Sequence, residues 1–141
     1  MIVYFDTSAL IKRYLTEADS PAVESVWNQA TLIGASEILY PEMAATFARK
    51  RREVPENAIL IGNAEANFRA DWRSFQKIPV GEEIHRRVDD LLTRHALRGA
   101  DSIHLASALL FRDLVADVVT FACADSALLG AARAQGLRTA P

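Results

Sequence analysis

The chain opens with a run of apolar, β-favouring residues, Ile2–Phe5, that leads directly into the acid Asp6. Two hydroxyl residues, Thr7 and Ser8, come next. A short apolar run of this kind is typical of a buried strand in a parallel sheet. Thr7 and Ser8 are favoured at helix starts, so a helix over 7–15 is predicted to follow at once. This order places Asp6 at the carboxyl end of a central strand, where open α/β sheets bind their ligands.

Further strands and helices alternate along the rest of the sequence. Short apolar runs predict strands over 31–35, 77–80 and 118–122, and a last short strand over 137–139. Apolar residues at helical spacing predict helices that begin near Pro21, at Ser36 or Pro41, and near Pro55, Gly81, Asp101 and Asp125. Strands that alternate with helices favour a small, mostly parallel sheet with helices on both faces, a three-layer α/β/α fold. Since no repeat or linker is visible, residues 1–141 are expected to form a single domain.

Two of these segments and both tryptophans have a definite expected place in the fold. Pro79 lies within the 77–80 strand, and because proline cannot donate to a strand ladder, this strand is expected at an edge. The segment 103–111 is apolar nearly all round, so its helix is expected to be buried between layers. Trp27 and Trp72 fall on predicted core stripes and are expected in the core.

The composition excludes several classes of protein. No stretch approaches the roughly 20 apolar residues that span a bilayer, and no basic segment precedes the first apolar run. The single cysteine, Cys123, excludes an internal disulfide and fits a reducing cytosol. We therefore expect a cytoplasmic protein without a signal peptide or a membrane span. The net charge of −2 gives no overall basic field that would indicate nucleic acid binding. If four of the eighteen acids bind a metal, however, the remaining charged residues have a net charge of +2.

Four acids follow predicted strands or open predicted helices: Asp6, Glu42, Asp101 and Asp125. In a parallel sheet with helical crossovers these positions lie at the carboxyl edge, where the four side chains could share one pocket. Four carboxylates would repel one another and raise one another's pKa values. A hard divalent cation removes this conflict, since Mg²⁺ and Mn²⁺ favour oxygen ligands. Such a site can deprotonate a bound water and stabilise a phosphodiester oxyanion.

Each of these acids also has a simpler interpretation. Asp101 and Asp125 could be ordinary helix N-caps, since aspartate is a favoured cap residue. Glu42 could be a solvated acid that interacts with a helix dipole. Asp6 is harder to explain in this way, because an acid directly after a buried strand is costly without a partner. Spacing alone does not distinguish a metal site from coincidence.

Four motifs in the sequence resemble those of the PIN-domain nucleases, and within them the VapC-type toxins of bacterial and archaeal toxin–antitoxin pairs. They are Tyr4-Phe-Asp-Thr-Ser-Ala-Leu10, Ser36-Glu-Ile-Leu-Tyr-Pro-Glu42, Arg98-Gly-Ala-Asp-Ser-Ile-His-Leu-Ala106, and Cys123-Ala-Asp125 with Leu128 and Gly136-Leu137. The motifs occur in the family's order and cover nearly the whole chain. The resemblance implies a PIN-like α/β/α fold and an Mg²⁺- or Mn²⁺-dependent ribonuclease that hydrolyses RNA with a metal-activated water.

The resemblance also implies roles for individual residues. Asp6 matches the family's first metal-binding acid, Glu42 its helical acid, Asp101 the acid of its Asp-x-x-His-Leu-Ala helix, and Asp125 its late acid. Ser8 matches a hydroxyl that is expected to hold the first carboxylate in place. Toxins of this kind are typically homodimers, and a small antitoxin neutralises them by placing its tail, often with an arginine, in the acidic groove.

Three residues near these motifs need separate interpretation. Cys123 stands where the family usually has Thr or Ser, and because a thiol is a poor donor the Asp125 site is the least secure of the four. His104 is expected to be a hydrogen-bonded structural histidine rather than a metal ligand, although it lies on the same helix face as Asp101. Asp117 precedes its strand and is expected at the opposite end of the sheet from the metal site.

RNA binding requires positive charge outside the acidic pocket. The densest basic run is Arg49, Lys50, Arg51 and Arg52, with further candidates at Lys12, Arg13, Arg86 and Arg87. A basic run at a helix end is also what a solvated, dipole-compatible terminus looks like, so both interpretations stay open.

Other α/β proteins with acids at strand ends are disfavoured. A phosphoacceptor signalling domain would need two acids after the first strand and a lysine after a late strand, but the chain has one acid there and no lysine beyond Lys77. A haloacid dehalogenase-type phosphotransferase would need Asp-x-Asp, where this chain has Ser8, and a dinucleotide-binding domain would need a glycine-rich turn. The remaining alternative is a catalytically weakened PIN-fold module that binds RNA or protein, and Cys123 keeps it open.

Overall fold

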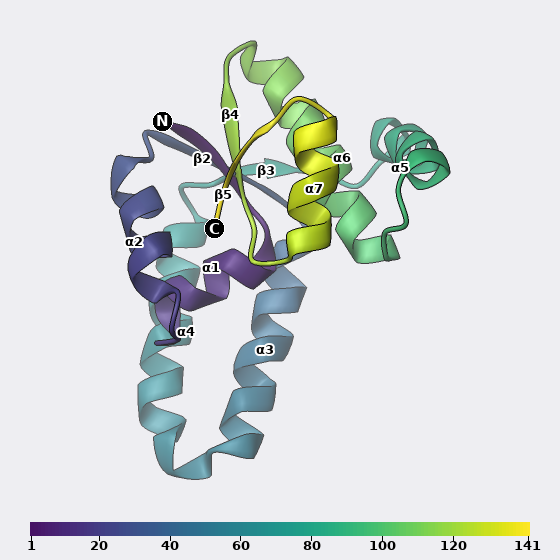
Figure 1. Ribbon diagram of the computed structural model, residues 1–141. Helices are drawn as coiled ribbons and strands as arrows, with labels where there is room; N and C mark the ends of the chain where they lie inside the picture. Colours follow the sequence, from purple (N-terminus) through teal and green to yellow (C-terminus); the bar gives the residue numbers. More distant parts are fainter.

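The sheet lies at the centre of the molecule and has five strands in the order β3-β2-β1-β4-β5 (Figure 1). The computed structural model describes all residues 1–141. The strands are β1 (Ile2–Phe5), β2 (Leu32–Ser36), β3 (Gln76–Ile78), β4 (Val119–Ala122) and β5 (Arg138–Ala140). Every neighbouring pair is parallel. The predicted strands are therefore confirmed to within two residues, with β1 at the centre and β3 at an edge. The prediction that Pro79 lies within its strand is wrong, because β3 ends at Ile78.

Helices cover both faces of this sheet and complete the predicted three-layer α/β/α fold. They are α1 (Thr7–Tyr14), α2 (Ser20–Gln29), α3 (Leu39–Glu53), α4 (Ala58–Trp72), α5 (Glu82–Arg94), α6 (Gly99–Val115) and α7 (Ser126–Ala134), with a 3₁₀ turn, η1 (Pro55–Asn57), before α4. None of them is long and apolar enough to cross a membrane.

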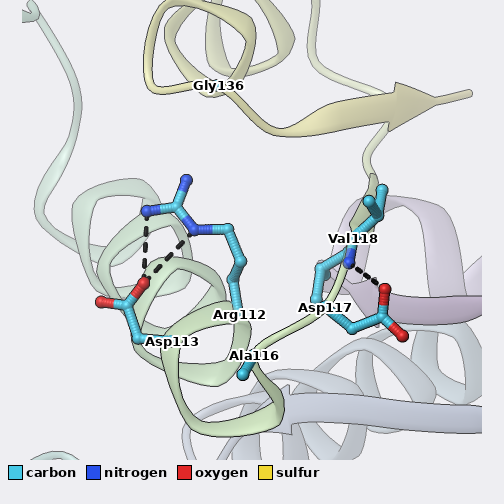
Figure 2. Close-up of a pocket in the computed structure, with 7 residues that line it drawn as sticks. Arg112, Asp113, Ala116, Asp117, Val118 and Gly136 are labelled. Carbon is cyan, nitrogen blue, oxygen red and sulfur yellow. Dashed lines mark hydrogen bonds and ion pairs between the residues drawn. The ribbon is translucent and has the colours of Figure 1, made fainter.

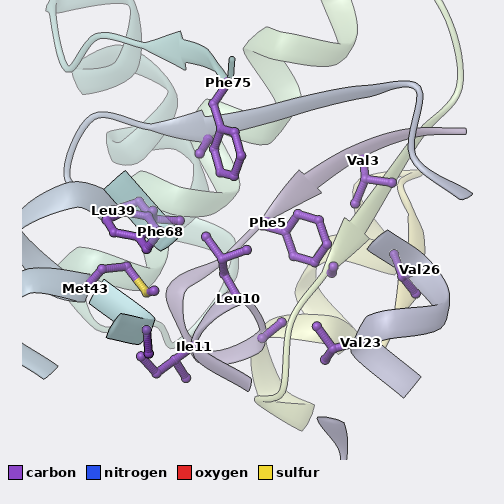
Figure 3. Packing of buried hydrophobic residues seen from close by; sticks show 14 of the residues in the cluster. Val3, Phe5, Leu10, Ile11, Val23, Val26, Leu39, Met43, Phe68 and Phe75 are labelled. Atoms are coloured by element: carbon purple, nitrogen blue, oxygen red, sulfur yellow. The ribbon is translucent and has the colours of Figure 1, made fainter. Parts of the chain in front are cut away.

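Two separate hydrophobic cores follow from the alternation of side chains along β1. Val3 and Phe5 point to the face covered by α1–α4, where they pack with residues such as Leu10 and Phe68 (Figure 3). Tyr4 points to the opposite face and joins the core formed by α5, α6 and α7. Eight residues of α6 are buried, which confirms that this apolar helix lies inside the structure. Trp27 and Trp72 pack against the first core, as expected.

Helices α3 and α4 form a hairpin that extends away from the sheet (Figure 1). Their facing sides are joined by Phe47 and Phe68, whose ring centroids are 6.1 Å apart. Glu65 on α4 is only 9% exposed, and it is paired with Arg51 at 3.3 Å and with Arg69 at 2.9 Å. Because a buried carboxylate is costly without partners, these two arginines are needed where they stand.

Several predicted boundaries are wrong by a few residues. Ser36 does not begin the third helix, because it is the last residue of β2 and pairs with Ile78; a turn follows, and α3 begins at Leu39. Pro41 lies in the first turn of α3, where its missing N–H has no helical partner to lose, so it produces no kink. Gly99 begins α6 instead of separating two helices, which places Asp101 inside the first turn.

Candidate metal centre

Asp6 lies at the junction of β1 and α1, and only 4% of it is exposed. Its backbone N–H donates to the Ala122 carbonyl, which carries the β1–β4 pairing to the end of the strand. Its carboxylate Oδ2 accepts hydrogen bonds from Ser8 Oγ at 2.7 Å and from Cys123 Sγ at 3.2 Å. Ser8 therefore stands beside the first acid, where the sequence placed it. The second oxygen, Oδ1, has no hydrogen bond from the protein, and its nearest basic group is His104 at 3.5 Å.

Cys123 contacts three residues at this end of the sheet: Asp6, Ser8 and Asp125. Its sulfur accepts the backbone N–H of Asp125 at 3.2 Å, while the neighbouring N–H of Ala124 donates to Ser8 Oγ at 3.0 Å. Burial, and next the negative charge of Asp6, raise the pKa of the Cys123 thiol to about 12. The thiol therefore keeps its proton at neutral pH and donates to Asp6. Cys123 occupies the position of a hydroxyl donor and performs the same function more weakly.

Glu42 lies in the first turn of α3 and is held by one oxygen. Oε1 accepts from Thr7 Oγ1 at 2.8 Å and from His104 Nε2 at 2.6 Å. Burial acts to raise the pKa of Glu42, but the hydrogen bond and charge of His104, and then the hydrogen bond from Thr7, outweigh it and the pKa is lowered. Glu42 is therefore a carboxylate with Oε2 left without a protein donor. Sequence reasoning missed Thr7, which it treated only as a helix-start residue.

Asp101 and Asp125 lie at the starts of two other helices. Asp125 is the N-cap of α7, where Oδ1 accepts the Leu128 N–H at 2.9 Å. Asp101 is not a cap; its Oδ2 accepts from Arg98 Nε at 3.1 Å. The hydrogen bond and the charge of Asp101 raise the pKa of Arg98, and the charges of Asp125 and Asp6 add to the shift. One guanidinium therefore experiences three of the four acids at once.

The donor set fits a hard divalent cation. Each of the four carboxylates has one oxygen engaged by protein donors and a second oxygen without a hydrogen bond: Asp6 Oδ1, Glu42 Oε2, Asp101 Oδ1 and Asp125 Oδ2. Carboxylate oxygens are the ligands that Mg²⁺ and Mn²⁺ prefer, and Mg²⁺ usually keeps several waters. As the side chains stand, no three His, Cys, Asp or Glu residues are grouped so as to enclose an ion. Binding would therefore have to draw the free oxygens together and displace Arg98 from Asp101.

The basic run lies further along α3 than Glu42. Arg49 is seven residues from Glu42, which places it about 10 Å along the helix axis. Arg49 forms an ion pair with Glu53 at 3.6 Å, and Arg51 forms one with the buried Glu65 at 3.3 Å. The four basic residues are thus separate from the acids, and two of them have acidic partners.

A broad hollow at the other end of the sheet is distinct from these acids. Its lining residues are Arg112, Asp113, Ala116, Asp117, Val118, Val119 and Gly136 (Figure 2). Asp117 precedes β4, as expected, and accepts the N–H of its neighbour Val118 at 2.6 Å. Asp117 and Asp125 therefore lie at opposite ends of the strands, because Asp117 precedes β4 and Asp125 follows it.

Comparison with known proteins identifies the family. Residues 3–121 match the model of the PIN domain. The chain belongs to the PIN domain family. This PIN protein is also 32% identical, over 140 residues, to Ribonuclease VapC45 and Ribonuclease VapC49, each from a strain of Mycobacterium tuberculosis. The matched region covers 99% of this chain and 95% of each relative, which places the PIN protein with the VapC type.

Solved structures share the fold at low sequence identity. The chain is similar to that of VapBC2 from Rickettsia felis, solved bound to a DNA fragment from their promoter, with a TM-score of 0.66, 12% identity, and coverage of 99% of this chain and 97% of that one. It is also similar to a toxin–antitoxin complex from Klebsiella pneumoniae, with a TM-score of 0.64, 18% identity, and coverage of 90% and 89%. These likenesses show that the PIN architecture extends over almost the whole chain.

Proposed function

We propose that this PIN protein is an Mg²⁺- or Mn²⁺-dependent RNA endonuclease and the toxin of a type II toxin–antitoxin pair. The observation that carries the proposal is the set of four carboxylates at the carboxyl edge, each fixed through one oxygen with the other free. The names of the two mycobacterial relatives support RNA as the substrate. A cytoplasmic location, where RNA is available and Cys123 stays reduced, belongs to the same proposal.

In this proposal Asp6, Glu42, Asp101 and Asp125 hold the metal. When bound, the ion supplies an activated water and neutralises charge on the phosphodiester, for in-line attack. The protein's own contribution is orientation. Ser8 and Cys123 hold one oxygen of the Asp6 carboxylate, and Thr7 and His104 hold one oxygen of Glu42, which leaves the other oxygen of each acid for the metal.

RNA and an antitoxin are the proposed partners. Lys50 and Arg52 are free of acidic partners in the basic run, and Arg49 has only an exposed partner, so these three are the proposed phosphate contacts, whereas Arg51 serves the hairpin. The similar structure from Klebsiella pneumoniae is a toxin–antitoxin complex, which supports a small antitoxin as the second partner. We also propose that the protein acts as a homodimer.

The proposal is tested by metal binding and RNA cleavage in the same preparation. Mn²⁺ should raise the melting temperature as its concentration rises. At 100 times the dissociation constant, the free energy of unfolding should be higher by about 2.7 kcal/mol. Asp6→Asn should lower RNA cleavage by about 100-fold or more, because it removes a charged ligand and little volume. Asp117→Asn is the matched control, since it makes the same change at the opposite edge, and should keep full activity.

Two outcomes would contradict the proposal. An Asp6→Asn protein with wild-type activity would show that cleavage does not use this site. A wild-type protein that neither cleaves RNA nor gains stability with Mn²⁺ would favour the second candidate, a PIN-fold binding module. The specific observation behind that candidate is Cys123, whose thiol is a weaker donor to Asp6 than the hydroxyl it replaces.

A further inference from the structure

A buried chain of hydrogen bonds runs from the backbone of β2 to the carboxylate of Glu42. The N–H of Ser36 donates to Tyr4 Oη at 3.0 Å, and Tyr4 Oη is 3.0 Å from His104 Nδ1. His104 Nε2 is 2.6 Å from Glu42 Oε1. Tyr4, Ser36 and His104 are each at most 1% exposed, so water does not compete for these contacts.

The contact with Glu42 fixes which ring nitrogen of His104 carries a hydrogen toward the acids. A carboxylate can only accept, so the 2.6 Å contact with Glu42 Oε1 requires a hydrogen on His104 Nε2. The Ser36 N–H is a donor only, so Tyr4 Oη accepts it. The phenolic proton of Tyr4 then has two buried neighbours, His104 Nδ1 and Ser107 Oγ. Burial raises the pKa of Tyr4 well above 10, so the phenol retains the proton that this arrangement needs.

The Nε2 atom of His104 also lies close to two acids of the site, Asp6 and Glu42. Besides its contact with Glu42, it is 3.5 Å from Asp6 Oδ1 and 3.4 Å from Thr7 Oγ1. Thr7 donates to the same Glu42 oxygen. His104 therefore contacts both carboxylates, and together with Thr7 it engages one oxygen of Glu42 and leaves Oε2 free. Its own ring cannot reach further, because it packs edge-on against the Tyr4 ring.

We propose that His104, held in place by Tyr4 with a hydrogen on Nε2, is the positioning residue that aims the Glu42 carboxylate for metal binding. This inference rests on the proposed function, since it concerns the same metal site. His104 is neither a ligand nor a proton carrier here. Partners that orient a metal-binding group are worth about 10-fold to 100-fold in metal affinity when removed.

The experiment compares Mn²⁺ affinity, by electron paramagnetic resonance, in the wild type and three variants. In His104→Asn the amide takes the place of Nδ1 and leaves no donor toward Glu42, so the affinity should fall by about 10-fold or more. In His104→Gln the amide takes the place of Nε2 and restores a donor, so most of the affinity should return. His85→Asn on the exposed side of α5 is the matched control and should bind as the wild type does. A purely structural histidine would not separate Asn from Gln in this way.

The tautomer is measured without metal from the ¹⁵N chemical shifts of the His104 ring. A hydrogen on Nε2 in the wild type supports the inference. A hydrogen on Nδ1 alone, or equal Mn²⁺ affinity in His104→Asn and the wild type, would overturn it while leaving the metal site intact. Absence of Mn²⁺ binding in the wild type would instead overturn the proposed function and the inference with it.

Discussion

Gly34 in β2 marks a place where α6 approaches the sheet too closely for a side chain. A Cβ atom built on Gly34 would lie 2.6, 2.7 and 2.8 Å from three ring carbons of Phe111. Phe111 is fully buried in the second core and cannot turn aside without displacing its neighbours. Gly34→Ala therefore inserts one methyl group where no space exists. Since α6 also carries Asp101 and His104, any shift of this helix reaches the candidate metal centre.

The expected cost of Gly34→Ala is about 1–3 kcal/mol, the usual range for overpacking a well-packed core. The sign is clear because the backbone gain from replacing a strand glycine is only about 0.5–1 kcal/mol. Urea unfolding at 25 °C should show a lower midpoint with an unchanged slope. Mn²⁺ affinity of the folded fraction should also fall, because Asp101 and His104 move with α6.

A double-mutant cycle identifies the ring as the cause. Phe111→Leu alone creates a cavity and should destabilise the protein. In Gly34→Ala combined with Phe111→Leu, the new methyl group occupies part of that cavity, so the two costs should not add, and a coupling of about 0.5–3 kcal/mol is expected. Additive costs, or a Gly34→Ala protein as stable as the wild type, would refute the packing argument.

Three further changes test separate parts of the structure. In Cys123→Ser the Mn²⁺ affinity should stay within about threefold of the wild-type value, and in Cys123→Ala it should fall further, because only serine retains a donor to Asp6. A calorimetric Mn²⁺ titration measures both affinities. The pKa of Glu42 is lowered in the folded protein, so Glu42 contributes to stability at pH values above its ordinary pKa of 4.5. This contribution is lost as the pH falls through the pKa of the folded state. Glu42→Gln should therefore reduce the difference between the urea midpoints at pH 7 and pH 3. Arg51→Met should cost about 1 kcal/mol in urea unfolding because Glu65 loses one of its two partners, whereas Arg52→Met should cost almost nothing.

The fold could be predicted from the sequence because its signals are local. A short apolar strand that runs into Asp6, followed by a helix, leaves few alternatives to a parallel crossover fold. The boundary at Ser36 could not be predicted, because Ser36 continues the β2 ladder with Ile78, a partner more than forty residues away. Gly34 gave no signal either, since its neighbour Phe111 is distant in the chain. Tertiary packing decides both positions.

The acids themselves were visible in the sequence, whereas the groups that hold them were not. Ser8 could be paired with Asp6 because the two residues are close in the chain and share a motif. The partners of Glu42 come from α1 and α6, and His104 is sixty-two residues away from it. No periodicity encodes such a contact. Cys123 was expected to be a poor substitute for a hydroxyl, and the structure shows why it still donates: burial keeps its proton in place.

The carboxyl edge of the sheet carries more negative charge than the protein neutralises. The helix starts at α6 and α7 offset part of the charge of Asp101 and Asp125. Hydrogen bonds stabilise Asp6 and Glu42 as carboxylates without removing their charge. Apart from His104, Arg98 is the one basic side chain bonded to this group of acids, and because 82% of its side chain is exposed it is a weak counterion. Because the donors that hold the acids cannot cancel their repulsion, the remaining charge favours a bound cation, and the free oxygen on each acid determines where that cation would bind.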